Sequence, residues 1–344
     1  MTSDVRQAVI MVGGKGTRLR PLTETKPKPI LPVLDKPCLR YLIESLVDAG
    51  ITEVILACGY RSDQMTEAIG DGSDLGITIE YSYEDEPRGT GGAIKLIEDR
   101  LDDTFVAANG DVFADISVKG EIEKHRETNA ALTIALTPVK NPCEFGIARL
   151  DESDRILEFK EKPKPEEVFS DLVNAGVYIV EKRLISEIPP DTFYDFSKDL
   201  FPMMLQRGDR IQGYILGGVW RDVGRPADLL GANLAMATKR YDGYLWGGKN
   251  IKGCEIRKPF FMGKDCELVD SNIVASVVLR GSAISSSKIS NSMIMADCKV
   301  DGAKIQNSII GEGCVIKEGA SISNMVLGDG TIVEKDEVLT ETRV

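Results

Sequence analysis

The stretch Ala8-Val9-Ile10-Met11-Val12 passes directly into Gly13-Gly14-Lys15-Gly16-Thr17-Arg18. The first five residues predict a buried β-strand, because an uninterrupted apolar run suits a strand covered on both faces. Glycines at the end of a strand let backbone N–H groups approach phosphate oxygens with no Cβ in the way. The junction therefore predicts a strand that ends in a phosphate-handling loop.

Two cations follow these glycines. Arg18 carries a rigid guanidinium fork that can hold a phosphate group at two points. Lys28 lies between Pro27 and Pro29, whose restricted φ angles limit where its ammonium group can point. The segment is neither a G-x-x-x-x-G-K-[ST] loop nor a G-x-G-x-x-G loop, since Leu19 stands where the third glycine of the latter would be.

Short apolar runs alternate with helical patterns over the first 240 residues. After the first run, strands are expected at residues 54–58, 77–81 and 105–109, which implies parallel β-α-β units. Later runs lie close together with few helices between them, so antiparallel strands are expected to extend the sheet; these runs are residues 131–136, 146–150, 156–160 and 173–180. The fold class predicted for residues 1–240 is α/β, with a doubly wound, Rossmann-like mixed sheet.

A different period begins after Tyr241. Apolar residues recur there at steps of five or six, and a step of about 5.4 residues would send successive side chains to opposite faces of a helix. Turn-forming Gly, Ser, Asn and Asp residues fill the intervals. The recurring positions are Leu268, Ile273, Val278, Ile284, Ile289, Ile294, Val300, Ile305, Ile310, Ile316, Ile322, Leu327, Val333 and Val338.

This pattern predicts a parallel β-helix of hexapeptide-like repeats over residues 241–344, whose stacked coils bury one apolar column. An irregular β-sandwich is the alternative. No acid, base or metal cluster recurs within the repeats, so assembly or regulation is the expected role of this second domain. The flat faces and the end of a β-helix commonly pair, and we therefore expect a homo-oligomer.

Composition narrows the functional classes. The 344 residues suit two domains, and 42% hydrophobic with 28% charged residues is typical of a soluble globular protein. A formal net charge of -12 argues against general nucleic-acid binding, which requires a basic footprint. No apolar run is long enough to span a membrane, and Met1-Thr2-Ser3-Asp4 does not begin a signal peptide, so a cytoplasmic location is expected.

Cysteine and histidine chemistry are not expected. The seven cysteines are scattered and form no C-x-x-C pair, which disfavours a structural zinc site and a disulfide framework. The single histidine, His125, lies in the polar helical stretch 121–126 and is expected on the solvated surface. A Ser-His-Asp mechanism and a histidine-based metal centre are therefore disfavoured.

The combination Gly13-Gly14-x-Gly16-Thr17-Arg18-Leu19-x-Pro21-Leu22-Thr23 with Pro27-Lys28-Pro29 resembles the signature of the sugar-nucleotidyltransferases. Further motifs extend the resemblance along the chain; they are Pro87-Arg88-Gly89-Thr90-Gly91-Gly92, Asn109-Gly110-Asp111, Glu161-Lys162-Pro163, Asn174-Ala175-Gly176 and Trp220-Arg221-Asp222-Val223-Gly224-Arg225-Pro226. A C-terminal left-handed β-helix occurs in many members of the family, which implies that handedness for the repeats.

The resemblance implies a role for each motif. Catalytic roles fall to Arg18, Lys28 and Asp111. Nucleotide binding falls to Gly13, Gly14, Gly16, Thr17, Pro87, Gly89, Thr90 and Gly110. Sugar-phosphate binding falls to Glu161, Lys162 and Asn174. The carboxylates of Asp111 and Asp222 are implied ligands of Mg²⁺, a hard cation that prefers oxygen and leaves positions for phosphate and water.

The implied substrates are a nucleoside triphosphate and a sugar-1-phosphate, with no membrane partner. Within the family the chain is most similar to mannose-1-phosphate guanylyltransferases, through residues 81–87, 196–204 and 218–222. Two residues depart from the usual base-binding loop: Arg88 replaces leucine and Gly91 replaces alanine.

Three alternatives stay open. One is a glucose-1-phosphate thymidylyl- or uridylyltransferase on the same scaffold. A second is a cytidylyl- or cofactor-guanylyltransferase, against which the motifs around Glu161, Asn174 and Trp220 speak. The third is a catalytically silent regulatory subunit that binds nucleotide sugar, against which the presence of Arg18, Lys28, Asp111 and Asp222 speaks.

Overall fold

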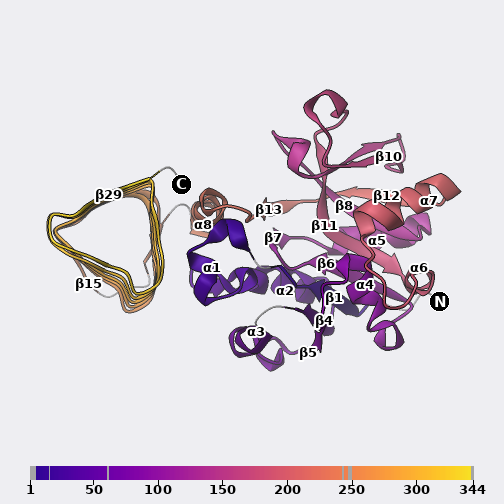
Figure 1. Ribbon diagram of the computed structural model, residues 1–344, viewed down its shortest axis with the longest axis horizontal. Helices are drawn as coiled ribbons and strands as arrows, with labels where there is room; N and C mark the ends of the chain where they lie inside the picture. Colours follow the sequence, from indigo (N-terminus) through magenta and orange to yellow (C-terminus); the bar gives the residue numbers. More distant parts are fainter. Residues whose placement is uncertain (1–4, 15, 60–61, 242–243, 247–249, 342–344) are drawn as a thin grey trace. The chain divides into compact units, whose positions relative to one another are not determined.

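The computed structural model describes residues 5–14, 16–59, 62–241, 244–246 and 250–341, so Lys15 of the glycine loop lies outside the described residues (Figure 1). The chain forms two compact units. The first comprises Met1–Gly14 with Leu39–Trp220, and the second comprises Lys15–Cys38 with Arg221–Val344. The second unit thus combines an N-terminal segment with the C-terminal third of the chain.

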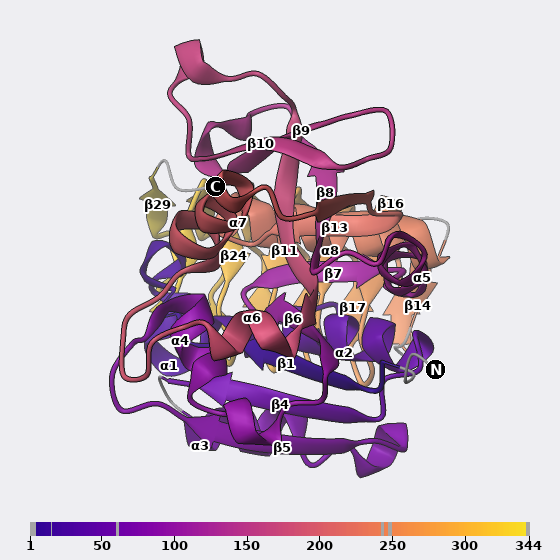
Figure 2. The same ribbon diagram turned by 90° about the vertical axis from the view of Figure 1, so that its right-hand side faces the viewer.

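The first unit is built on a mixed sheet whose strand order is β10-β9-β11-β6-β1-β4-β5, with β8 and β12 joined beside β11. Its parallel strands are β1 (Gln7–Met11), β4 (Glu53–Cys58), β5 (Thr78–Tyr83) and β6 (Thr104–Asn109). The order β5-β4-β1-β6 places the first strand in the middle, as in a doubly wound fold, and Figure 2 shows these strands side by side. The predicted α/β fold is confirmed.

Antiparallel strands extend this sheet, as the closely spaced runs predict. They are β8 (Leu132–Pro138), β9 (Gly146–Leu150), β10 (Ile156–Glu161) and β11 (Leu172–Glu181), while β12 (Ile211–Ile215) runs parallel to β8. β11 pairs with β6 and β8, and its register with β8 shifts between Asn174 and Tyr178. That irregularity places Asn174 at a bend in a central strand.

Helices cover the parallel strands. Val9, Ile55 and Ala107 lie in one core with Ala93 and Ile94 of α4 (Gly89–Lys95). The alternate residues of β1 are fully buried too, which is why its sequence shows no polar alternation. The other helices of this unit are α2 (Cys38–Asp48), α3 (Ser62–Ile69), α5 (Lys119–Thr128), α6 (Lys182–Ser186) and α7 (Phe201–Arg207).

The expectation for His125 is wrong. Its ring is only 3% exposed and contacts the Thr133 hydroxyl at 2.8 Å and the Glu181 carboxylate at 3.2 Å. Burial lowers the pKa of His125 despite Glu181, so the ring is a neutral packing residue. The sequence of α5 does not reveal that His125 lies on the buried face, because Glu121, one turn earlier on the same face, is polar and yet buried as well.

Glu121 provides a test of pH-dependent stability. It is fully buried, neither of its carboxylate oxygens has a hydrogen-bond partner in the described part of the chain, and burial raises its pKa well above 4.5. The folded protein therefore keeps this proton above the pH at which the unfolded chain loses it, and stability falls as pH rises from 4.5 through the folded-state pKa.

Glu121→Gln removes this titration. Because each unit of pKa difference corresponds to about 1.4 kcal/mol, we expect the thermal midpoint of the variant to gain at least ~2 °C on the wild type between pH 5 and pH 8. Calorimetry of both proteins at both pH values measures this change. Both proteins contain His125, so its contribution to the pH dependence of stability is the same in each and does not affect the difference. A midpoint difference that stays constant with pH contradicts the prediction.

The second unit contains a parallel β-helix, and Figure 1 views its coils end on, as a triangle. Stacked partners lie 16 or 17 residues apart, which is three hexapeptide-like steps. The apolar repeat therefore forms three inward columns, one for each side of the triangle, where the sequence alone predicted one. The columns are Leu268-Ile284-Val300-Ile316-Val333, Ile273-Ile289-Ile305-Ile322-Leu339 and Val278-Ile294-Ile310-Leu327. The prediction for Val338 is wrong: its side chain is 70% exposed, and Leu339 takes the place in the column because alternate strand residues point to opposite faces.

The strands of these coils are β14 (Tyr244–Trp246), β15 (Asn250–Lys252), β16 (Glu255–Met262), β17 (Glu267–Val269), β18 (Asn272–Val278), β19 (Ala283–Ser285), β20 (Lys288–Ser290), β21 (Met293–Ile294), β22 (Lys299–Asp301), β23 (Lys304–Gln306), β24 (Ile309–Ile310), β25 (Val315–Ile316), β26 (Ser321–Ser323), β27 (Val326–Leu327), β28 (Ile332–Val333) and β29 (Val338–Thr340). Corners take left-handed backbone angles that Asn, Asp and Gly tolerate. At one corner Asn291 donates to Asn307, and Asn307 to Asn324, as an amide ladder.

The rest of the second unit packs on these coils. α8 (Pro226–Tyr241) contacts β16, β18 and β2 (Pro32–Val33), which pairs with β3 (Lys36–Pro37). The N-terminal segment adds two short 3₁₀ helices, η1 (Thr17–Leu19) and η2 (Lys28–Ile30), on either side of α1 (Leu22–Thr25). Across the described ranges, no helix has the length and apolar character needed to cross a bilayer.

Candidate active site

The part of the glycine loop that belongs to the second unit forms a tight turn with residues 23–28. Gly16 adopts a left-handed conformation (φ 59°), and its carbonyl accepts a 2.8 Å hydrogen bond from the Thr23 hydroxyl. A Cβ at Gly16 would lie 3.1 Å from Thr23 Cγ2 and 3.2 Å from Lys28 Cβ. Backbone conformation and space both call for glycine here, and the turn brings Lys28 back beside the residues that precede Arg18.

Arg18, Lys28 and Asp222 meet around Gly224. A Cβ at Gly224 would lie 2.9 Å from the Asp222 carboxylate and 3.0 Å from Arg18 Nη2. Lys28 Nζ lies 3.5 Å from Asp222 Oδ1, and the Lys28 side chain is only 7% exposed. Thr17 and Arg18 are exposed in η1. Three of the predicted residues, which are up to 204 positions apart in sequence, are thus neighbours.

In the first unit the loop after β1 is open. Gly13 and Gly14 are exposed, and among the residues that the structure describes a Cβ at Gly14 would meet no atom within 4 Å. Glu84 faces Gly13, since its Oε1 lies 3.1 Å from where a Cβ at Gly13 would be. Burial raises the pKa of Glu84, against the opposing effect of the Arg88 backbone N–H and charge. In the sequence, Glu84 is only one residue of the stretch 81–87 that carries the likeness to mannose-1-phosphate guanylyltransferases.

Gly14 allows a sharp prediction. Gly14→Ala adds a methyl group that meets no atom of the described residues within 4 Å, so we expect an unchanged thermal midpoint. If phosphates approach this backbone, the methyl group obstructs them, and the KM for the nucleoside triphosphate that the resemblance implies should rise about tenfold, or ~1.4 kcal/mol. Initial rates of pyrophosphate release measure it. Gly217→Ala, at another exposed glycine with open space, is the matched control and should keep the wild-type KM.

Residues 192–196 contact the predicted base-binding loop, residues 87–92, and form hydrogen bonds with it. Gly91 and Gly92 donate their N–H groups to the Tyr194 carbonyl at 2.8 and 3.1 Å. The Thr90 hydroxyl accepts from the Phe196 N–H at 2.8 Å, so this predicted nucleotide ligand also anchors the loop. Gly89 is left-handed (φ 72°), and Pro87 before it is exposed.

The two unusual residues of this loop have structural partners. Arg88 forms an ion pair of 2.6 Å with Asp191. A Cβ at Gly91 would lie 2.8 Å from Tyr194 Cδ1 and 3.1 Å from Ile188 Cδ1. The position of the Tyr194 ring therefore explains why glycine stands here in place of alanine.

The predicted sugar-phosphate motifs gather in the first unit. Lys162 has a left-handed backbone (φ 46°), held by a 2.9 Å hydrogen bond from its N–H to the Phe145 carbonyl, and its side chain is 65% exposed. Such strain in a residue other than glycine is concentrated at functional sites. Phe145 packs edge-on against Trp220, whose indole N–H donates to the Ala175 carbonyl at 2.8 Å.

Asn174 lies in the same cluster with its amide already engaged. Its Nδ2 donates to the Tyr178 hydroxyl at 2.9 Å and to the Ser197 hydroxyl at 3.3 Å, while its Oδ1 accepts from the Gly176 N–H. A Cβ at Gly176 would lie 2.6 Å from Asn109 Nδ2. Asn174 thus shapes the turn that packs on Asn109, two residues before Asp111.

Asp111 lies between β6 and β7 (Val112–Ile116), which pairs with β13 (Gly218–Asp222). The Gly110 N–H donates to the Met11 carbonyl at 2.8 Å, and a Cβ at Gly110 would lie 2.4 Å from Val12 Cγ1. Gly110 is therefore required for the turn to pack against the end of β1. This packing places Asp111 at the carboxyl edge of the sheet, where ligands bind in such folds.

Three carboxylates act electrostatically on Tyr178. Burial raises the pKa of Tyr178, and the negative charges of Asp195, Glu161 and Asp111 raise it further. Burial also raises the pKa of Glu161. Sequence reasoning missed Asp195, whose side chain accepts from the N–H groups of Ser197 and Lys198 and so caps the π-helical turn Phe196–Leu200.

A divalent cation would find few protein ligands here. In the part of the chain that the structure describes, no group of three or more His, Cys, Asp or Glu residues could hold a metal ion. Mg²⁺ needs only one or two carboxylates when substrate phosphates and water supply the other oxygens. Asp222, with its side chain 23% exposed, offers a hard oxygen donor of that kind.

Comparison with known proteins agrees with these motifs. Residues 7–239 match the Nucleotidyl transferase family, and residues 246–342 match the GlmU-like, C-terminal hexapeptide family. A mannose-1-phosphate guanylyltransferase of Mycobacterium tuberculosis is 41% identical over 225 residues, covering 65% of this chain and 62% of that protein. The match thus spans about three fifths of the length of that relative.

Two further proteins show the breadth of the likeness. A UTP–glucose-1-phosphate uridylyltransferase of Synechocystis is 31% identical over 273 residues, 75% of this chain and 69% of that protein. The structure of a putative glucose-1-phosphate thymidylyltransferase from Bacillus anthracis, in complex with a sucrose, has a TM-score of 0.61 at 26% identity and covers 71% of this chain and 98% of that one. The doubly wound sheet, the motifs at its edge and the match over residues 7–239 together establish that this chain belongs to the Nucleotidyl transferase family.

Proposed function

We propose that this chain joins a nucleoside triphosphate to a sugar-1-phosphate, forming an NDP-sugar and pyrophosphate. The observation that carries the proposal is the group formed by Arg18, Lys28 and Asp222 around Gly224. A phosphate oxygen of the sugar-1-phosphate bonds to the α-phosphorus while the bond to pyrophosphate breaks, and pyrophosphate departs with that electron pair. The nucleophile is already an anion, so no strong general base is needed.

The tasks left to the protein are alignment and charge neutralisation. Arg18 neutralises the leaving pyrophosphate, and Lys28 neutralises the phosphates near the reacting phosphorus. Lys162, exposed on its strained turn, grips the sugar phosphate. Glu161 and Asn174 hydrogen-bond to sugar hydroxyls, and the Gly13, Gly14 and Gly89 backbones face the nucleotide.

Magnesium belongs to this proposal as the group that Asp111 and Asp222 would hold. When bound, Mg²⁺ supplies positive charge at the phosphates and orients them. The Lys28 ammonium group lies 3.5 Å from the Asp222 carboxylate, and this contact restricts the positions of both side chains.

For the substrate pair we propose GTP and mannose-1-phosphate, giving GDP-mannose. The support is the 41% identity to the mycobacterial guanylyltransferase, together with the motif likeness of residues 81–87, 196–204 and 218–222. The alternative is a glucose-1-phosphate uridylyl- or thymidylyltransferase, favoured by the resemblance to the Synechocystis and Bacillus anthracis proteins.

The protein is proposed to act as a homo-oligomer.

Pyrophosphate release across five nucleoside triphosphates and several sugar-1-phosphates tests both levels of the proposal. GTP with mannose-1-phosphate should give the highest kcat/KM. If that pair is among the poorest while another pair reacts, the guanylyl assignment is wrong but the reaction class stands. If no pair releases pyrophosphate from the chain alone, the catalytic proposal itself fails.

A further inference from the structure

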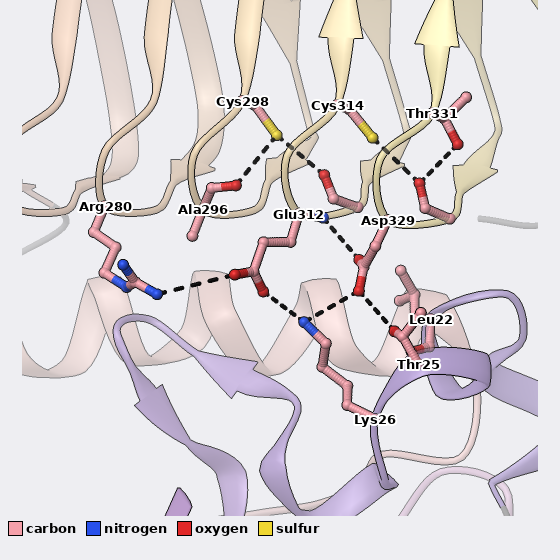
Figure 3. Close-up of polar contacts among 12 residues, drawn as sticks. Leu22, Thr25, Lys26, Arg280, Ala296, Cys298, Glu312, Cys314, Asp329 and Thr331 are labelled. Carbon is pink, nitrogen blue, oxygen red and sulfur yellow. Dashed lines mark hydrogen bonds and ion pairs between the residues drawn. The ribbon is translucent and has the colours of Figure 1, made fainter. Parts of the chain in front are cut away.

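The segment that joins Arg18 to Lys28 lies against the last coils of the β-helix within the second unit (Figure 3). The Thr25 hydroxyl donates to Asp329 Oδ2 at 2.6 Å. Lys26 Nζ lies 2.5 Å from Glu312 Oε2 and 3.2 Å from Asp329 Oδ2. One lysine is therefore held by two carboxylates from consecutive coils.

The contact of Lys26 with Asp329 is more than a surface ion pair, whereas the Glu312 side chain is 38% exposed. The side chains of Lys26 and Asp329 are only 19% and 17% exposed, and Asp329 Oδ1 also accepts the Glu312 N–H at 2.8 Å. Burial by itself would lower the pKa of Lys26, but Glu312 and Asp329 raise it overall, so the amine stays charged. Partial burial and a fixed acceptor make such a pair stronger than an exposed one.

Apolar contact supplements the charges. A Cβ at Gly328 would lie 3.3 Å from Pro21 Cβ, so Pro21 packs directly on the backbone of the coil. Downstream of Lys28, the Leu34 N–H donates to Asn233 Oδ1 at 2.7 Å and Asp35 accepts from the Arg280 N–H at 3.3 Å. The segment is thus held on both sides of Lys28 by the C-terminal part of the chain.

A displacement at Lys26 would reach the phosphate-handling residues. Lys28 is two residues away, and its Cβ would touch a Cβ at Gly16 at 3.2 Å. Thr23, three residues before Lys26, bonds the Gly16 carbonyl. Gly16 immediately precedes η1, which carries Arg18. The turn is too tightly packed to move at one point alone.

We propose that Glu312 and Asp329 are positioning residues, through which the β-helix holds Lys26 and so fixes where Arg18 and Lys28 present their charges. The inference rests on the proposed function, in which these two cations act on phosphates. It gives the β-helix a part in the reaction itself, beyond assembly. A misplacement of about 1 Å in such groups can cost on the order of 100-fold in rate.

The test compares two double variants of the full chain. Glu312→Gln with Asp329→Asn removes the charges that hold Lys26. Glu318→Gln with Glu334→Gln is the matched control, because these residues of the same coils pair with Lys335 and Lys317 at 3.0 and 2.6 Å but their side chains are 68% and 65% exposed. Both double variants remove two acidic groups that pair with lysine, and the Glu312/Asp329 variant also removes the 3.9 Å ion pair of Glu312 with Arg280.

Hydrogen exchange of the peptide 16–31 reports the positioning directly. In the Glu312/Asp329 variant, exchange should quicken severalfold, and kcat/KM for the nucleoside triphosphate should fall about tenfold, whereas the control variant should match the wild type in both. Lys26→Met alone should reproduce the loss. Combining it with the Glu312/Asp329 variant should add little, because residues acting through one contact are not additive.

Three results would overturn the proposal: unchanged exchange in the Glu312/Asp329 variant, equal effects in the control variant, or fully additive effects with Lys26→Met. Failure of the proposed function is a separate result. In that case the wild type releases no pyrophosphate with any substrate pair, and the exchange comparison still decides whether the β-helix orders residues 16–31.

Discussion

Asp111→Asn is expected to reduce pyrophosphate release by more than about 1000-fold while the protein stays folded. One lost hydrogen-bond donor to a transition state costs about 10²–10³ in kcat, and an implied metal ligand that also lies at the sheet edge should cost more. The substitution preserves the shape of the side chain, and the close packing of Gly110 against the end of β1 is left unchanged. Steady-state rates across a Mg²⁺ titration, with the thermal midpoint recorded in parallel, measure the effect.

Asp171→Asn is the control for this prediction. Asp171 is an exposed aspartate of the same unit, and its removal should change neither the rate nor the midpoint by a measurable amount. Wild-type-like turnover in Asp111→Asn would rule out the metal assignment for this residue. A lost rate accompanied by a collapse of the thermal midpoint would instead assign Asp111 a structural role.

Arg18→Ala is expected to lower kcat/KM by a factor of about 150, equivalent to ~3 kcal/mol of transition-state stabilisation. The side chain is exposed in η1 and lies beside the Asp222 carboxylate at Gly224, so its removal costs the fold little. Pyrophosphate release at varied nucleotide concentration separates kcat from KM.

Two variants check the reason for this effect. Arg18→Lys keeps the charge but loses the planar fork, and should recover only part of the rate. Arg20→Ala removes an exposed arginine two residues along the same segment and should behave like the wild type. A change in thermal midpoint without a change in rate for Arg18→Ala would show that Arg18 is structural.

The sequence predicts the fold because its periodicities are strong. The run Ala8–Val12 is apolar at every position, as a strand with both faces covered must be, and it forms the centre of the parallel sheet. The steps of five and six residues predict coils with equal clarity, since a helix cannot accommodate them. The number of apolar columns could not be predicted from this periodicity. Apolar residues recur at the same steps of five or six whether they line one side of the coil or all three.

Local polarity misled the prediction for His125. Glu121 and His125 are one helical turn apart in a polar stretch, yet both are buried. Buried ionisable groups of this kind are rare enough that a polar pattern normally indicates solvent. Only the packing of α5 on its neighbours shows otherwise.

Some residues of the candidate site could be predicted from the sequence, and others could not. Gly13, Gly14, Arg18 and Lys28 could be chosen from sequence because phosphate chemistry needs open backbone and cations at short spacing. Asp195 and Glu84 could not, since the significance of Asp195 lies in its cap on Phe196–Leu200 and its charge near Tyr178, and that of Glu84 in its place beside Gly13. The partner of Arg88, Asp191, is likewise more than 100 positions away.

The sequence by itself determined the two architectures, the phosphate-handling loop and the family motifs, because each is written in local spacing. Only the tertiary structure decided that Lys28 meets Asp222, and that Lys26, between two predicted phosphate-handling cations, is held by Glu312 and Asp329. The reason is physical: a short-range pattern records the conformation of a segment, whereas the partner of a charge is decided by how distant segments pack.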